Sequence, residues 1–147
     1  MRPFTLLFLL VAISAPAATT DEKDALAIVQ KLFDGIAAHD AAMLRATMLP
    51  DAHVYAARDA AAPTASTVAE TVDRLTGLKE ELLERFTSTP QVSVHGRIAE
   101  VWGEYDFMQG GKFHHCGVDS ATLLKTAEGW KISALVFTAE TTGCKGH

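Results

Sequence analysis

Apolar and polar positions alternate along residues 92–141 in the way that strands do. Val, Ile, Thr, Tyr, Phe and Trp dominate four runs, and short glycine-containing breaks separate them. β-Branched and aromatic residues favour strands, and glycine readily adopts the positive φ of tight turns. The pattern therefore predicts an antiparallel meander with strands at 92–94, 98–107, 113–126 and 130–141.

The last turn of this meander also predicts a register. If Ala127 faces Trp130, Cys116 falls opposite Thr141, and Cys144 lies three residues further along. A bulge or a diagonal contact at the strand end would close that gap. We therefore expect Cys116 and Cys144 to be cross-strand neighbours that form one disulfide, with two separate thiols as the alternative.

A capping box, Thr19-x-x-Glu22, precedes the first apolar stripe at helical spacing. Asp40 reads as the N-cap of a second, shorter helix that is stopped by Pro50. This part of the chain therefore predicts three elements: a helix that ends near residue 39, a short helix at 41–47 and a short strand at 53–55.

A second capping box spans residues 67–70, after an alanine-rich loop at 58–66. The apolar stripe that follows it continues across Gly77 to Phe86, and Pro90 ends it. We expect one long helix here, or two helices joined at Gly77.

Helices precede hairpins in this order, so the predicted fold class is α+β, with N-terminal helices packed on a strongly curved antiparallel sheet. Such a bent sheet with helices across it encloses a cone. The mouth of the cone is a natural cavity for a small molecule.

The N-terminus carries the pattern of a signal peptide. Arg2 precedes an apolar run at 4–13, and Ala15-Pro16-Ala17 has the small-x-small form of a cleavage site. We predict a signal peptide at 1–18 and one domain at 19–147, with a retained N-terminal anchor as the alternative. The mature protein is then periplasmic or secreted, where a disulfide can persist.

Charge and motifs exclude several function classes. The 147 residues carry a formal charge of −5 and no basic stripe, so we expect no nucleic-acid partner. No second apolar stretch is long enough to span a bilayer, so no membrane partner is expected after cleavage. The sequence lacks a P-loop, GxGxxG, nucleophile elbow or CxxC, and no cofactor is predicted. Metal ligation is also not predicted, because His114 and His115 should point to opposite faces of one strand.

Five segments together resemble the NTF2-like superfamily, most closely its SnoaL-like and "putative lumazine-binding" branches. They are residues 99–107, 111–113, 115–119, 129–132 and the terminal Cys144. Asp40 and the Pro50-Asp51-Ala52 sequence are similar to the usual first half of that fold, so the resemblance covers roughly residues 21–144. It implies the cone-shaped fold, a homodimer formed through the sheet, and functions that range from isomerases and dehydratases to transport factors.

Strand alternation sorts the residues that could carry chemistry. His115 and Asp119 share one face of the predicted strand at 113–126. The candidate ligand-binding residues are Tyr55, Tyr105, His115, Asp119 and His53. Each has a structural alternative: His115 as a hydrogen-bonded sheet residue, Asp119 as a backbone partner at a strand edge, and Tyr105, like Trp130, as core.

Three functional hypotheses follow. The first is an exported domain that binds a small apolar or aromatic molecule in the cone. The second is an isomerase, dehydratase or hydrolase that uses Asp119 or His115 as general acid or base. The third is a dimeric interaction or stress-related module without a ligand. No catalytic set of a named enzyme matches position by position.

Overall fold

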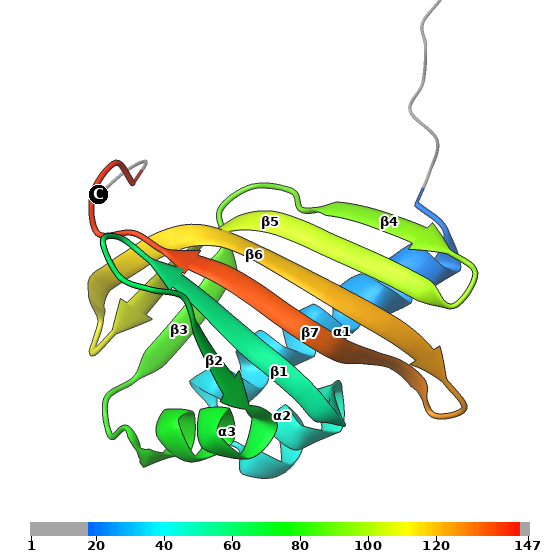
Figure 1. Ribbon diagram of the computed structural model, residues 1–147, viewed down its shortest axis with the longest axis horizontal. Coiled ribbons are helices and arrows are strands. Elements are labelled where there is room, and N and C mark those ends of the chain that lie inside the picture. Colours follow the sequence, from blue (N-terminus) through cyan, green and yellow to red (C-terminus); the bar gives the residue numbers. More distant parts are fainter. Residues whose placement is uncertain (1–17, 145–147) are drawn as a thin grey trace, which may run out of the picture.

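The computed structural model describes residues 18–144, and three helices cover one face of a curved seven-stranded sheet (Figure 1). The predicted signal peptide lies outside these residues except for Ala18. No helix within 18–144 combines the length and apolarity needed to cross a membrane. The elements are α1 (Thr20–Ala37), α2 (Ala41–Thr47), β1 (Met48–Arg58), β2 (Thr64–Thr67), α3 (Val68–Gly77), β3 (Leu82–Phe86), β4 (Gln91–His95), β5 (Ile98–Gln109), β6 (Lys112–Thr126) and β7 (Gly129–Ala139).

The predicted helix starts are confirmed. Thr19 and Thr67 each accept a hydrogen bond from the backbone N–H of the third residue of the following helix, and the glutamate side chain at that position accepts one from the backbone N–H of the cap. The Asp40 carboxylate accepts from the backbone N–H groups of Ala42 and Met43. Side chains thus satisfy the first N–H groups, which have no partner inside the helix.

The strand order is β2-β1-β7-β6-β5-β3, with β4 also paired to β5. Every pair is antiparallel except β1 and β7, which run parallel, so the sheet is mixed. The last strand of the chain therefore occupies the middle of the sheet. The α+β class and the helices on one curved face agree with the prediction.

The long helix expected after residue 67 is wrong beyond Gly77. Residues 82–86 form β3, which pairs antiparallel with β5 from Leu82 opposite Gln109 to Phe86 opposite Tyr105. The apolar stripe was misleading because residues four apart lie on one face of a helix. Since four is an even number, they also lie on one face of a strand. The polar run at 79–81 separates the two elements.

Strand β1 is also longer than the short strand predicted at 53–55. It spans Met48–Arg58 and includes Pro50, in a part of the strand where the register with β7 is irregular. Proline is tolerated where no ladder hydrogen bond is needed. Helix α2 ends at Thr47 and β1 begins at the next residue, so Pro50 lies inside the strand and not at the end of the helix.

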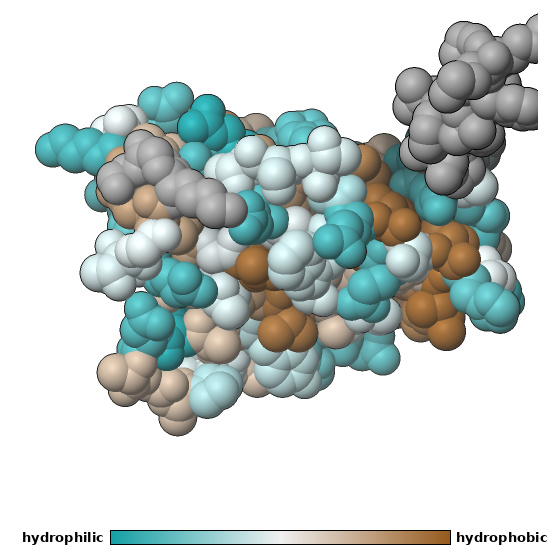
Figure 2. Space-filling model, turned by 90° about the horizontal axis from the view of Figure 1, so that it is seen from above, coloured by the Kyte–Doolittle hydropathy of each residue, from teal (hydrophilic) through white to brown (hydrophobic). Residues whose placement is uncertain are grey.

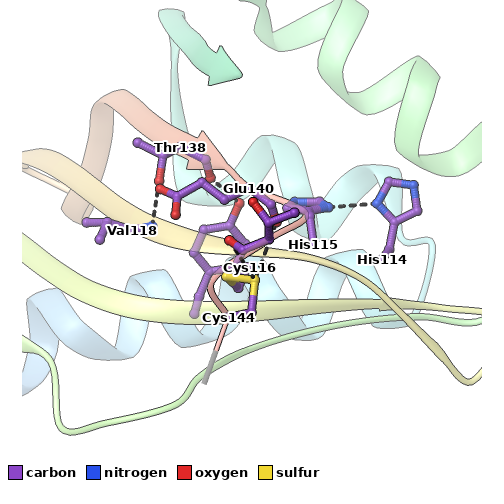
Figure 3. Close-up of a disulfide and its surroundings, with 9 residues drawn as sticks. His114, His115, Cys116, Val118, Thr138, Glu140 and Cys144 are labelled. Atoms are coloured by element: carbon purple, nitrogen blue, oxygen red, sulfur yellow. Dashed lines mark hydrogen bonds between the residues drawn. A yellow bond between two sulfur atoms is a disulfide. The ribbon is translucent and has the colours of Figure 1, made fainter. Parts of the chain in front are cut away.

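The predicted β6–β7 register is wrong by one to two residues. Thr126 pairs with Gly129, so the turn is one residue earlier than expected, and a bulge follows between Thr122 and Leu123. Cys116 therefore lies opposite Glu140 instead of Thr141. The disulfide itself is present: Cys116 and Cys144 are bonded, with a Cα–Cα distance of 5.9 Å (Figure 3).

The core lies between α1 and the inner face of the sheet. Ala25 and Val29 of α1 are fully buried. They belong to the same apolar cluster as four inner-face residues of the sheet, which are at most 1% exposed: Ala99, Val101, Ala121 and Leu123. Tyr105 and Trp130 are also buried, which agrees with the alternative prediction that both are core residues.

Candidate functional site

A cavity of about 200 Å³ opens between the helices and the sheet. Its walls come from α1, α3 and five strands, and most of the lining is aliphatic or aromatic. The polar lining residues are few and come from different elements: Arg58, Thr71, Arg74, Glu84, Tyr105, Gln109, His114 and His115. This combination of an apolar wall and a few convergent polar groups is typical of small-molecule sites.

The structure brings three of the five sequence candidates to this side of the sheet. Tyr105 and His115 line the cavity. Asp119 lies on the same inner face at 1% exposure, behind the lining. His53 and Tyr55 alternate with the cavity-lining Val54 and therefore lie on the outer face, where their rings stack 6.2 Å apart.

The most unusual feature is a carboxyl pair formed by Glu84 and Asp119, whose side chains are joined by a hydrogen bond. Burial raises the pKa of Asp119 to about 7, against the effect of the hydrogen bond from Glu84. Burial, followed by the charge of Asp119, raises the pKa of Glu84 well above its usual value. Near neutral pH, Glu84 is therefore the protonated donor of the pair.

One oxygen of this pair remains without a partner. Asp119 Oδ2 is buried and makes no hydrogen bond within residues 18–144. A buried polar atom without a partner is costly, and such atoms mark strained or functional sites. Glu84 lies partly buried at the cavity wall, so the pair can reach a ligand through Glu84.

Sequence reasoning missed Glu84, because it assigned residues 82–86 to a helix. In β3, Leu82 and Phe86 share a face with Glu84, and that face packs on the core. The available signal was the position itself: Glu84 is a charged residue in the middle of an alternating apolar pattern.

Tyr105 holds a fixed position beside the pair. Its hydroxyl donates a 2.7 Å hydrogen bond to the Thr138 carbonyl, across Gly117, which pairs with Tyr105. A Cβ at Gly117 would lie 2.2 Å from that carbonyl oxygen, so only glycine allows the approach. Burial, then the charges of Asp119 and Glu84, raises the pKa of Tyr105, and the phenol stays protonated.

His114 and His115 both line the cavity, so the expectation that they point to opposite faces is wrong. Phe107 pairs with His115 while Met108 pairs with Phe113, which leaves His114 as the extra residue of a bulge. Their Nδ1 atoms lie 2.8 Å apart, so one ring donates and the other accepts (Figure 3). Burial, then the charges of His114 and Arg58, lowers the pKa of His115 to about 4, and this ring is neutral at pH 7.

The disulfide fixes the end of β6 that carries these histidines. Cys116 exchanges two backbone hydrogen bonds with Glu140, and the Val118 N–H donates to the Thr138 hydroxyl at 3.0 Å (Figure 3). His115 itself stacks on Phe107 with ring centroids 4.9 Å apart. The bulged segment is therefore held from both sides.

Metal binding has little support here. Within residues 18–144, no three His, Cys, Asp or Glu side chains gather in a way that could hold a metal ion. The groups at the site that can form hydrogen bonds to a ligand include Glu84 and the two histidines.

Comparison with known proteins agrees with this architecture. The family described as "Putative lumazine-binding" matches residues 20–138, and the chain belongs to this family. It is thereby a member of the NTF2-like superfamily. No curated protein matches the chain in sequence.

Many solved structures share the fold at low sequence identity. An NTF2-like superfamily protein from Salmonella enterica is 12% identical, with a TM-score of 0.67 over 87% of this chain and 96% of its own. A "putative dehydratase" from Streptomyces avermitilis is 18% identical, with a TM-score of 0.67 over 82% and 96%. A "putative aromatic ring hydroxylase" from Novosphingobium aromaticivorans is 13% identical, with a TM-score of 0.69 over 84% and 92%. At these identities the likeness concerns the fold alone.

Proposed function

We propose that this chain is an exported domain that binds a small apolar or aromatic molecule in the cavity. The observation that carries the proposal is the cavity itself, with an apolar lining of Phe107, Leu135, Phe137 and residues of α1 and α3. Removing an apolar ligand from water into such a lining is favourable by about 25 cal/mol per Å². Export is supported by the signal-peptide pattern and by the disulfide, which persists in oxidising compartments.

The homodimer implied by the superfamily is part of this proposal. The outer face of the sheet carries Trp102, Leu124 and Val136 at 37–45% exposure. Figure 2, which views the molecule from the side opposite α2 and α3, shows apolar surface interrupted by polar side chains. Ultracentrifugation of the purified protein over a range of concentrations measures its oligomeric state.

Ligand binding is tested by native mass spectrometry of protein purified from the periplasm, followed by thermal shift with one- and two-ring aromatic compounds. We expect a retained ligand or a compound that raises the melting temperature. Leu135→Trp fills the cavity and should abolish the shift. Leu75→Trp should also fill the cavity, and it replaces Leu135→Trp as the test variant if that protein does not fold. No ligand and no shift in the wild type would refute the proposal.

A second candidate function is proton-transfer catalysis, favoured by the buried Glu84–Asp119 pair. A carboxyl whose pKa lies near 7 can both take and return a proton at neutral pH. In this reaction, Glu84 passes its proton to Asp119 as it takes a proton from the carbon next to a carbonyl of the bound molecule, and a hydrogen-bond donor in the cavity stabilises the oxyanion. Hydrogen bonding to Asp119 positions Glu84.

Tautomerisation of phenylpyruvate, followed by the absorbance of its enol, tests this candidate. We expect a rate above the buffer reaction that Glu84→Gln and Asp119→Asn each reduce by at least about ten-fold. Glu81→Gln makes the same carboxyl-to-amide change on an exposed residue outside the cavity and is the matched control. A wild-type rate equal to buffer would reject proton transfer for this compound and leave the binding proposal standing.

A further inference from the structure

Two arginines at the cavity have no anionic partner. Arg58 ends β1 and Arg74 lies in the last turn of α3, and both line the cavity. Within residues 18–144, neither forms an ion pair, whereas Arg45 pairs with Asp73 at 3.5 Å and Arg85 with Asp106 at 2.9 Å. Within the described residues, an acidic chain thus leaves two cations at this cavity without an anionic partner.

The two guanidinium groups lie near enough to repel each other. Burial, and then the charge of Arg58, lowers the pKa of Arg74. Arg58 is oriented by its position over the Phe137 ring, 5.7 Å from the centroid, and by a 3.4 Å hydrogen bond to Thr64. Both arginines are exposed to solvent, and two like charges at one wall of a cavity favour an anion between them.

The carboxyl pair lies on the opposite wall. Strand β1, which carries Arg58, and β3, which carries Glu84, are separated in the sheet by β7, β6 and β5. The cavity is therefore cationic at one wall and carries a largely protonated carboxyl at the other, with aromatic and aliphatic side chains between them. A ligand that matches this order has one anionic end and an uncharged body.

We propose that the ligand is a small aromatic carboxylate, with its carboxylate between Arg58 and Arg74 and its ring in the apolar part of the cavity. This inference rests on the proposed binding function and specifies the ligand class. Guanidinium groups match carboxylates in planar, two-point geometry. A cavity of about 150 Å³ is enough for benzene, so about 200 Å³ suits one ring with a short side chain.

The test is calorimetric titration with cinnamate and with cinnamamide, which has nearly the same shape but no charge. We expect wild-type protein to bind cinnamate more tightly than the amide. Arg58→Gln and Arg74→Gln should each raise the Kd for cinnamate by about ten-fold, because each removes a charged hydrogen bond, and leave the amide unchanged. Lys31→Gln makes the same charge change on an exposed part of α1 and should alter neither Kd.

The outcomes separate this inference from the proposal beneath it. Equal affinity for the two compounds, unchanged in both arginine variants, would overturn the carboxylate assignment and leave the binding function intact. Absence of binding for both compounds, or binding that persists in Leu135→Trp and Leu75→Trp, would overturn the cavity as the site and the assignment with it. Affinity for cinnamate alone should also fall as salt is raised.

Discussion

The inner faces of β5 and β6 are filled differently in their two halves. In one half, Ala99 and Val101 of β5 lie beside Ala121 and Leu123 of β6, and all four are at most 1% exposed. In the other half, the same strands present Tyr105, Phe107 and His115 to a cavity. One pair of strands therefore provides a solid core at one end and the wall of a cavity at the other.

Helix α1 follows the same division. Its N-terminal half buries Ala25 and Val29 completely, whereas Leu32 and Ile36 from its C-terminal half line the cavity. The close-packed core and the cavity thus lie along the same helix and the same two strands. Substitutions in the solid half should change folding, and those in the cavity half should change binding with smaller effects on folding.

The largest expected effect comes from Leu123→Ala in the solid half. It should lower the free energy of unfolding by about 2–5 kcal/mol, because it leaves a void in a close-packed core. Leu75→Ala at the cavity should cost about 1 kcal/mol or less, since that side chain already faces a hollow. Urea unfolding measures both, and equal losses would remove the distinction between the halves.

Loss of the disulfide should have the next largest effect. The bridge joins residues 28 apart in sequence. The loop-entropy estimate for such a bridge is about 3–4 kcal/mol. Cys116→Ser/Cys144→Ser should lower stability by up to this amount. Hydrogen exchange should speed up mainly at residues 112–118, on the cavity side, and a uniform increase along β6 would contradict local anchoring.

Asp119→Asn should change the pH dependence of stability. The native Asp119 pKa is about 7 and the ordinary value is 3.8, so the folded state binds more protons between these values. The contribution of Asp119 to stability should therefore fall as pH rises from about 4 to 7, by at most about 1.4 kcal/mol per pH unit. The variant should lose this slope, and exposed Asp24→Asn should keep it. Denaturant unfolding at a series of pH values measures it.

The smallest effect concerns His115. Its pKa of about 4 lies below the ordinary 6.5, so the unfolded state binds more protons in this window. This residue therefore lowers stability as pH falls from 6.5 towards 4, opposite in sign to Asp119. NMR titration, with His115→Gln used to assign the signals, should show a ring that stays neutral to about pH 4. Protonation near pH 6.5 would contradict its burial.

The sequence predicted the solid half better than the cavity half. Capping boxes at Thr19 and Thr67, glycine turns and alternating strands are local signals, and each led to the observed element. His115 and Asp119 were placed on one face by the same alternation. These predictions needed no knowledge of which strands become neighbours.

The missed features depend on contacts between distant segments. Glu84 reaches the cavity because β3 pairs with β5, which a helical stripe did not indicate. His114 joins His115 because of a bulge that only the register reveals. His53 and Tyr55 lie on the outer face because the longer β1 points Val54 inward. Arg58 and Arg74 line one cavity only because α3 packs on β1.

The central position of the last strand constrains when this chain can fold. β1 follows α2 early in the sequence, yet its main partner is β7, which ends at Ala139. The early strands cannot join the rest of the sheet until the segment that forms β7 has been synthesised, and such distant pairings form slowly. The export proposed above requires a polypeptide that crosses the membrane before it becomes compact, and a strand order that postpones completion of the sheet until β7 is available suits that requirement.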